Sequence, residues 1–135
     1  MLAGPLFLWV LTGNLAANLL RNLWTSTIIF CGHFTGEVET FNQQDCENES
    51  QGQWYYRQAL GSSNIKGGNL FHVMTGHLSY QIEHHLFPDL PAKRYREIAP
   101  KVQAIFKEHG IHYNTGGFFR QYFSVVKRIV RYSFP

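Results

Sequence analysis

The alternation of apolar and polar positions divides the chain into three parts. Residues 1–20 carry no charged side chain. As a helix rising about 1.5 Å per residue they would reach about 30 Å, the thickness of the hydrocarbon core of a bilayer. The apolar pattern resumes at Leu23 and ends at Gly32-His33. We therefore predict a helix within residues 1–33.

This first helix admits three interpretations. A secretory signal peptide would need a basic start and a small-residue cleavage site, and the sequence shows neither. The second interpretation, a buried helix of a soluble protein, remains open. Asn14, Asn18 and Arg21 recur at spacings of four and three, so they share one face, which would pack against other helices. We favour a transmembrane helix.

The middle and third parts differ in periodicity. Residues 34–68 include an acidic stretch without helical or strand periodicity and are predicted to form a loop region, with a short helix over residues 54–60. The helical pattern returns over residues 69–86, where Pro88 stops it. Residues 92–109 predict an amphipathic helix.

The last segment, FFRQYFSVVKRIVRYSF, interleaves basic residues with aromatic and aliphatic ones. This pattern is typical of a helix on an anionic membrane surface, although an amphipathic helix packed on a protein core would look the same. Nine of the 12 Lys and Arg residues lie at Lys93 or later. Such a basic excess near a membrane segment places the tail on the cytoplasmic side. The predicted fold is all-α and membrane-associated, with one transmembrane helix, a histidine-bearing helix and a cytosolic helical tail.

Composition excludes several classes of protein. Charged residues make up 16% of the chain and aromatic residues another 16%, which argues against a disordered chain and against a coiled coil. The mean hydropathy of −0.21 means that any lipid-embedded part is local. We expect a membrane partner and no nucleic-acid partner.

The histidines are the most informative residues. Four of the seven lie within 14 residues, at His72, His77, His84 and His85. On a helix, Gln81, His84 and His85 share one face, and His77 precedes His84 by one heptad. Adjacent imidazoles can reach two metal ions, or one ion and a neighbouring group. This density predicts a metal site.

The spacing excludes several kinds of metal site. Imidazole suits zinc, copper, iron and nickel alike. The sequence contains no HExxH motif and no Glu three residues before a His, which excludes the carboxylate-rich di-iron site of ferritin type. It also lacks a His-x-Glu followed by Cys-x-x-Cys, which excludes a zinc deaminase. A histidine-rich site at a membrane edge remains.

The run QIEHHLFP, together with the preceding HLSY, closely resembles the third histidine box of the membrane fatty-acid desaturases. Its QxxHH form is similar to that of front-end desaturases and their bacterial acyl-CoA or acyl-lipid relatives. Flanking stretches resemble the last membrane helix and the cytosolic tail of that family. By this resemblance, residues 1–135 are the C-terminal part of a desaturase domain, with a transmembrane segment (1–33), a loop region (34–68), and the third histidine box and cytosolic tail (69–135).

The resemblance implies a di-iron centre. In this family histidines from three boxes, and one more at the cytosolic end of the last membrane helix, hold two iron ions. His84 and His85 match the box ligands, and His33 matches the additional ligand. Gln81 stands where many relatives have the first histidine of the box. We expect Gln81 and His77 to orient a ligand or to bind weakly, and no catalytic residue beyond the ligands.

The first two histidine boxes of the family, HxxxH-like and HxxHH, are absent from this sequence. The resemblance therefore implies a piece that begins at or near the last transmembrane helix. We expect the intact parent to use O₂, two iron ions and electrons from ferredoxin or cytochrome b5. It would remove two hydrogens from adjacent methylenes of an acyl-CoA or acyl-lipid. We expect the piece alone to be inactive.

Other functions remain open at this point. A membrane di-iron hydroxylase uses a similar histidine-rich centre but inserts oxygen. A truncated, non-catalytic remnant would also lack the first two boxes. A membrane-surface binding protein would account for the basic aromatic tail but would leave the tandem histidines unexplained. Mass analysis of the product distinguishes a desaturase from a hydroxylase.

Overall fold

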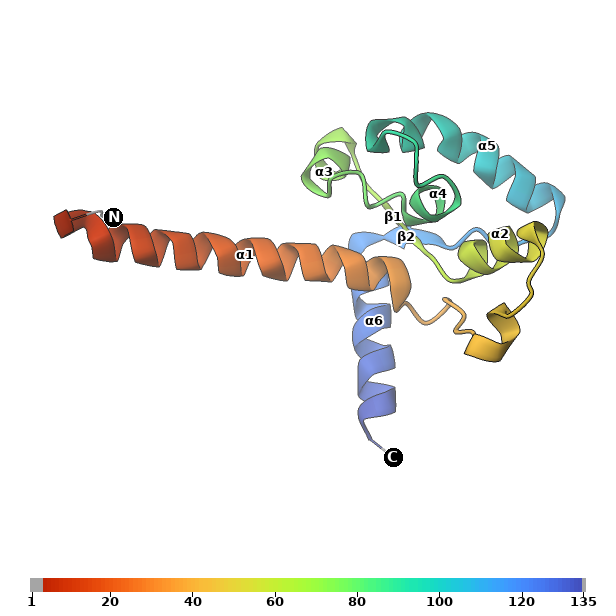
Figure 1. Ribbon diagram of the computed structural model, residues 1–135, viewed down its shortest axis with the longest axis horizontal. Helices are drawn as coiled ribbons and strands as arrows, with labels where there is room; N and C mark the ends of the chain where they lie inside the picture. The colour runs from red at the N-terminus through yellow and green to blue at the C-terminus, as the bar shows by residue number, and fades with distance from the viewer. Residues whose placement is uncertain (1–3, 135) are drawn as a thin grey trace.

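The computed structural model describes residues 4–134, apart from the side chain of Asp45, and most of them are helical (Figure 1). The predicted all-α class is therefore confirmed, with two very short strands added. In chain order the elements are η1 (Gly4–Leu6), α1 (Phe7–His33), η2 (Gln43–Cys46), α2 (Gln51–Leu60), β1 (Asn64–Lys66), α3 (Asn69–Met74), α4 (Gln81–Leu86), η3 (Ala92–Arg94), α5 (Tyr95–Glu108), β2 (Thr115–Gly117) and α6 (Phe118–Ser133).

Helix α1 extends away from the rest of the molecule (Figure 1). Only its C-terminal end is buried, at Ile28, Cys31 and Gly32. No helix within residues 4–134 combines the length and the apolar character needed to cross a membrane, so the predicted transmembrane helix is not supported. At 27 residues α1 is long enough. Asn14, Asn18 and Arg21, which are exposed, lower its mean hydropathy.

The predicted loop region contains regular structure. Helix α2 includes the predicted helix over residues 54–60 and begins earlier, because a capping box fixes its start. The Ser50 N–H donates to Gln53 Oε1 at 2.7 Å, and the Gln53 N–H donates to Ser50 Oγ at 3.3 Å. Reciprocal bonds of this kind satisfy donors that the first helical turn leaves unpaired.

The single helix predicted over residues 69–86 is wrong, because a turn divides it into α3 and α4. Gly76 and His77 occupy the left-handed region, at φ 59° and 62°, which ends a right-handed helix. The Ile65 N–H also donates to the Ser79 carbonyl at 2.9 Å. Since the turn interrupts the helical repeat, the heptad relation predicted between His77 and His84 does not hold.

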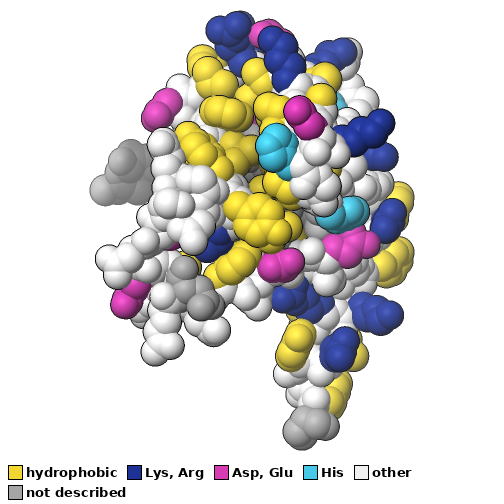
Figure 2. Space-filling view, turned by 90° about the vertical axis from the view of Figure 1, so that its right-hand side faces the viewer, with side chains coloured by type: hydrophobic (Ala, Val, Ile, Leu, Met, Phe, Trp, Pro, Cys, Tyr) yellow, Lys and Arg dark blue, Asp and Glu magenta, His cyan; other side chains and the backbone are white. Residues whose placement is uncertain are grey.

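Two apolar clusters hold the elements together. One joins α2, α4 and α5 through Ala59, Ile82, Leu86, Val102 and Phe106. The other joins the end of α1 to β1 and α6 through Ile28, Cys31, Ile65 and Val125. Strands β1 and β2 pair in parallel, and Ile65 of β1 belongs to the second cluster. The face carrying α2 and α5 has an apolar hollow of about 600 Å³ (Figure 2).

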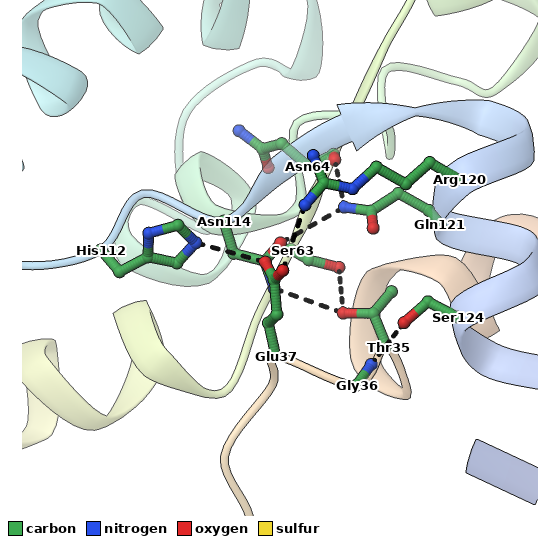
Figure 3. A network of polar contacts seen from close by, with 10 residues as sticks. All are labelled: Thr35, Gly36, Glu37, Ser63, Asn64, His112, Asn114, Arg120, Gln121 and Ser124. Atoms are coloured by element: carbon green, nitrogen blue, oxygen red, sulfur yellow. Dashed lines mark hydrogen bonds and ion pairs between the residues drawn. The ribbon is translucent and has the colours of Figure 1, made fainter. Parts of the chain in front are cut away.

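The end of α1 is fixed by polar contacts that involve the segment before β1. Ser63 Oγ donates to the Cys31 carbonyl at 2.6 Å, and the Ser63 N–H donates to the Gly32 carbonyl at 2.9 Å. These carbonyls belong to the last helical turn, where no intrahelical donor is available. Thr35 and Asn114 continue the network toward β2 (Figure 3). The network thereby fixes the position of His33, the last residue of α1.

Candidate metal centre

The structure brings together four residues that the sequence singled out. His33 ends α1, and Gln81, His84 and His85 lie on α4. The ring centroids of His33 and His85 are 4.9 Å apart, and those of His84 and His85 are 5.7 Å apart. Gln81 Nε2 lies 3.1 Å from His33 Nε2. Residues 48 positions apart in the sequence therefore meet at one place.

Both α4 histidines are held through Nδ1. Gln58 Oε1 lies 2.9 Å from His85 Nδ1. The Tyr95 hydroxyl lies 3.1 Å from His84 Nδ1 and donates its own proton to the Phe87 carbonyl. An amide oxygen can only accept, so His85 Nδ1 carries the proton and His85 Nε2 keeps its lone pair. The Tyr95 hydroxyl holds the His84 ring through the same nitrogen. This is the arrangement by which an outer partner orients a metal-binding imidazole.

Gln81 lies between the two helices because residue 32 is glycine. A Cβ on Gly32 would lie 2.9 Å from Gln81 Cγ, closer than real contacts allow. The Gln81 amide nitrogen donates to His33 Nε2. The Gln81 Oε1 is buried and has no hydrogen-bond partner within the described part of the chain. An amide oxygen beside His33 is thus left available to another group.

The surroundings keep two of the imidazoles neutral. Burial, together with the nearby His33 and His84, lowers the pKa of His85 to about 4. Burial also lowers the pKa of His33, against a hydrogen bond with the Gly61 backbone that raises it. A neutral imidazole is the form that binds a metal ion. At neutral pH, these two rings are therefore in the binding form.

Acid is expected to destabilise the metal-free chain through this site. The pKa of His85 is about 4 in the fold, against an ordinary value of 6.5. The unfolded state therefore binds more protons between these values. The stability due to neutral His85 is fully present above about pH 6.5 and is lost as the pH falls toward 4.

Urea unfolding at several pH values measures this loss, and His85→Gln should flatten the curve. Burial raises the pKa of Glu83 and acts in the opposite direction, so the informative quantity is the difference between parent and variant. An equal pH dependence of stability for the parent chain and His85→Gln would contradict the lowered pKa of His85.

The residues at this site match a metal ion in chemical type but not in number. Within the described residues, no three His, Cys, Asp or Glu side chains lie close enough to hold a metal ion by themselves. The donors nevertheless fit iron in kind, since imidazole nitrogen is a suitable ligand for it. The rings of His33, His84 and His85 lie close together, and Gln81 Oε1 is without a partner among the described residues. The assignment of His33, His84 and His85 as ligands stays a prediction.

The other two clustered histidines lie elsewhere. The His77 N–H donates to the His72 carbonyl at 2.7 Å, and His77 Nδ1 is buried without a partner among the described residues. His72 is buried, with its Nδ1 2.7 Å from Ser79 Oγ and its ring stacked on Tyr80. The backbone of His77 thus bonds within the turn between α3 and α4, and its predicted role toward the metal stays untested.

Helix α4 rests on a polar network that the sequence did not predict. Glu83 is 0% exposed, and it accepts hydrogen bonds from Asn64 Nδ2 at 2.8 Å and from the Tyr113 hydroxyl at 2.7 Å. Asn64 Oδ1 also accepts the Ile82 N–H at 2.9 Å. Since Asn64 is on β1 and Tyr113 precedes β2, the short sheet fixes α4 and its histidines. No local sequence pattern indicates these long-range partners.

The sequence profile of the fatty acid desaturase family matches residues 1–117. The chain belongs to the fatty acid desaturase family. The resemblance inferred from the QIEHH run is thereby confirmed, and the named relatives below are oxidoreductases.

This desaturase-family chain is 42% identical over 132 residues to the NADPH-dependent stearoyl-CoA 9-desaturase of Mycobacterium tuberculosis, covering 98% of this chain and 31% of that protein. It is 36% identical over 112 residues to the acyl-lipid 8-desaturase of Rebecca salina, covering 80% and 25% respectively. It is 28% identical over 120 residues to human fatty acid desaturase 3, covering 89% and 25%. The chain thus spans about a third or less of the length of these relatives. No solved structure is significantly similar to it.

Proposed function

We propose that this chain supplies part of a di-iron centre for the O₂-dependent desaturation of a fatty acyl chain. The observation that carries the proposal is the convergence of His33, His84 and His85 at the junction of α1 and α4. Outer partners hold both α4 rings through Nδ1. Family membership supports the reaction, and the three histidines would supply ligands to two ions together with donors outside these residues.

The chain's own residues would hold and orient the centre. Gln58 would keep the proton of His85 on Nδ1, so that this ring presents Nε2, and Tyr95 would hold the His84 ring through Nδ1. Gln81 would exchange its hydrogen bond with His33 for a contact through Oε1 or would orient the ring. When bound, iron with O₂ supplies the oxidising power that an unactivated C–H bond requires and that acid–base chemistry lacks.

The reaction balances with an external reductant. Two hydrogens leave adjacent methylenes, and two electrons from a donor protein plus two protons complete the reduction of O₂ to two waters. We propose ferredoxin or cytochrome b5 as the donor class. The names of the relatives include a stearoyl-CoA and an acyl-lipid desaturase, so we propose an acyl-CoA or acyl-lipid substrate.

A chimera tests this proposal. This chain would replace the matching segment of the Mycobacterium tuberculosis relative, with which it aligns over 132 residues. We expect the chimera to contain two iron ions per protein and to form a desaturated product, whereas the chain alone should do neither. A folded chimera without iron or product would overturn the proposal, and a hydroxylated product would identify the alternative hydroxylase.

Replacing Gln58 tests the orientation of His85. In the chimera, Gln58→Leu removes the acceptor of the Nδ1 proton, so His85 can rotate or change tautomer. We expect iron affinity or turnover to fall by about 10- to 100-fold, the usual effect of losing such a partner. Gln103→Leu, on the exposed surface of α5, is the matched control. Equal values for both variants would show that Gln58 does not position His85.

A further inference from the structure

Helix α6 presents an apolar face that the rest of the chain does not cover. Phe119, Phe123, Val126 and Val130 recur at spacings of four and three, so they share one side of the helix. Their exposed fractions are 71%, 64%, 37% and 52%. The opposite side is packed, since Gln121 and Val125 are buried. The apolar face therefore points away from the protein core.

A basic edge runs beside this face. The charged residues of α6 are all Lys or Arg. Arg128 turns back and donates to the Thr35 and Val38 carbonyls at 2.7 and 2.8 Å, which fixes α6 to the loop after α1. Lys127 and Arg131 are instead exposed. They lie at a recess of about 320 Å³ that Gly36, Ser124, Arg128 and Tyr132 complete.

The loop contacts hold the recess in place. Ser124 Oγ accepts the Gly36 N–H at 2.7 Å, and Arg120 pairs with Glu37 at 3.1 Å (Figure 3). The end of α6 nearest this loop is therefore anchored. The helix then projects away from the body of the molecule (Figure 1).

The apolar surface continues from α6 onto α1. Phe119 and Phe123 line a shallow recess of about 410 Å³ together with Leu20 and Leu23 of α1. Trp24 closes its floor and contacts the Phe118 ring, with centroids 6.1 Å apart. The two helices thus offer one continuous apolar surface, and the basic edge lies along its border on α6.

We propose that this face of α6 lies on a lipid surface that carries anionic head groups. Phe119, Phe123 and Val130 would enter the boundary between head groups and acyl chains. Lys127 and Arg131 would contact the phosphates, with the recess between them receiving a head group. The purely cationic edge and the aromatic content favour an anionic lipid over a protein partner, because both are features of interfacial helices.

Vesicle binding by the whole chain tests the proposal. The chain, transferred from detergent, is mixed with phosphatidylcholine vesicles with or without phosphatidylglycerol, and the bound fraction is measured by flotation. The preference for anionic vesicles should fall by about 30-fold in Lys127→Gln/Arg131→Gln, since each basic residue near such a surface adds to the attraction. Lys93→Gln/Lys107→Gln removes the same charge from exposed positions on η3 and α5. This control should change the preference for anionic vesicles little.

The apolar contribution has its own pair of variants. Phe119→Ser/Phe123→Ser should weaken binding to both kinds of vesicle by at least tenfold. Tyr56→Ser/Ile105→Ser is the control, because these residues, 52% and 55% exposed, lie at the apolar hollow between α2 and α5. Circular dichroism confirms that each variant is folded. Equal effects of the test and control pairs would overturn the proposal, and so would the absence of any preference for anionic vesicles in the unaltered chain.

Discussion

Replacing His85 with alanine in the chimera is expected to abolish desaturation and to lower the iron content from two ions toward one. His85 is the histidine that contacts both His33 and His84, so its loss leaves a gap in the middle of the group. The loss of turnover should exceed the 10- to 100-fold expected for removing an outer partner alone. Elemental analysis for iron and mass analysis of the acyl product measure the two effects.

His109→Ala is the matched control for this experiment, because His109 is an exposed histidine at the end of α5. It should keep both iron and activity. If His85→Ala retained two ions and full turnover, the ligand assignment would be wrong even though the family membership would stand. A loss of iron together with a loss of folding would be recognised by circular dichroism.

Asn64→Ala is expected to lower the free energy of unfolding by about 1.5–3 kcal/mol, the range for a hydrogen bond to a charged group. The Asn64 side chain donates to Glu83 and to the Tyr113 hydroxyl, and it accepts the Ile82 N–H. All of these groups then lose a partner inside the protein. Because folded domains are stable by about 5–15 kcal/mol, urea unfolding of the chain in mild detergent should show a large shift.

Asn14→Ala on the exposed part of α1 is the control and should change stability by less than about 0.5 kcal/mol. The effect of Asn64→Ala should also shrink at low pH. Burial already raises the pKa of Glu83, and removing the Asn64 hydrogen bond raises it further, so protonation relieves the carboxylate that has lost one of its two donors. A loss below about 1 kcal/mol, or one that does not vary with pH, would show that the network does not depend on Asn64.

Local sequence patterns correctly predicted those elements whose conformation depends on nearby residues. The QIEHH run lies on a helix, α4, as predicted, and the amphipathic repeat over residues 92–109 predicted η3 and α5. The prediction of one continuous helix over residues 69–86 was wrong, because Gly76 and His77 take the left-handed conformation after α3. Nothing in the apolar repeat indicates that His77 takes a conformation that most residues avoid.

The sequence by itself determined the family, the helical class and the residue types of the candidate site, because each of these depends on side-chain identity or on spacing within one element. Only the tertiary structure decided which nitrogens of His84 and His85 have partners, since Gln58 and Tyr95 reach both Nδ1 atoms from other helices. It also decided that Gly32 admits Gln81 beside His33 and that Asn64 supports α4. Such contacts join residues far apart in the chain, so their geometry follows from packing and not from local pattern.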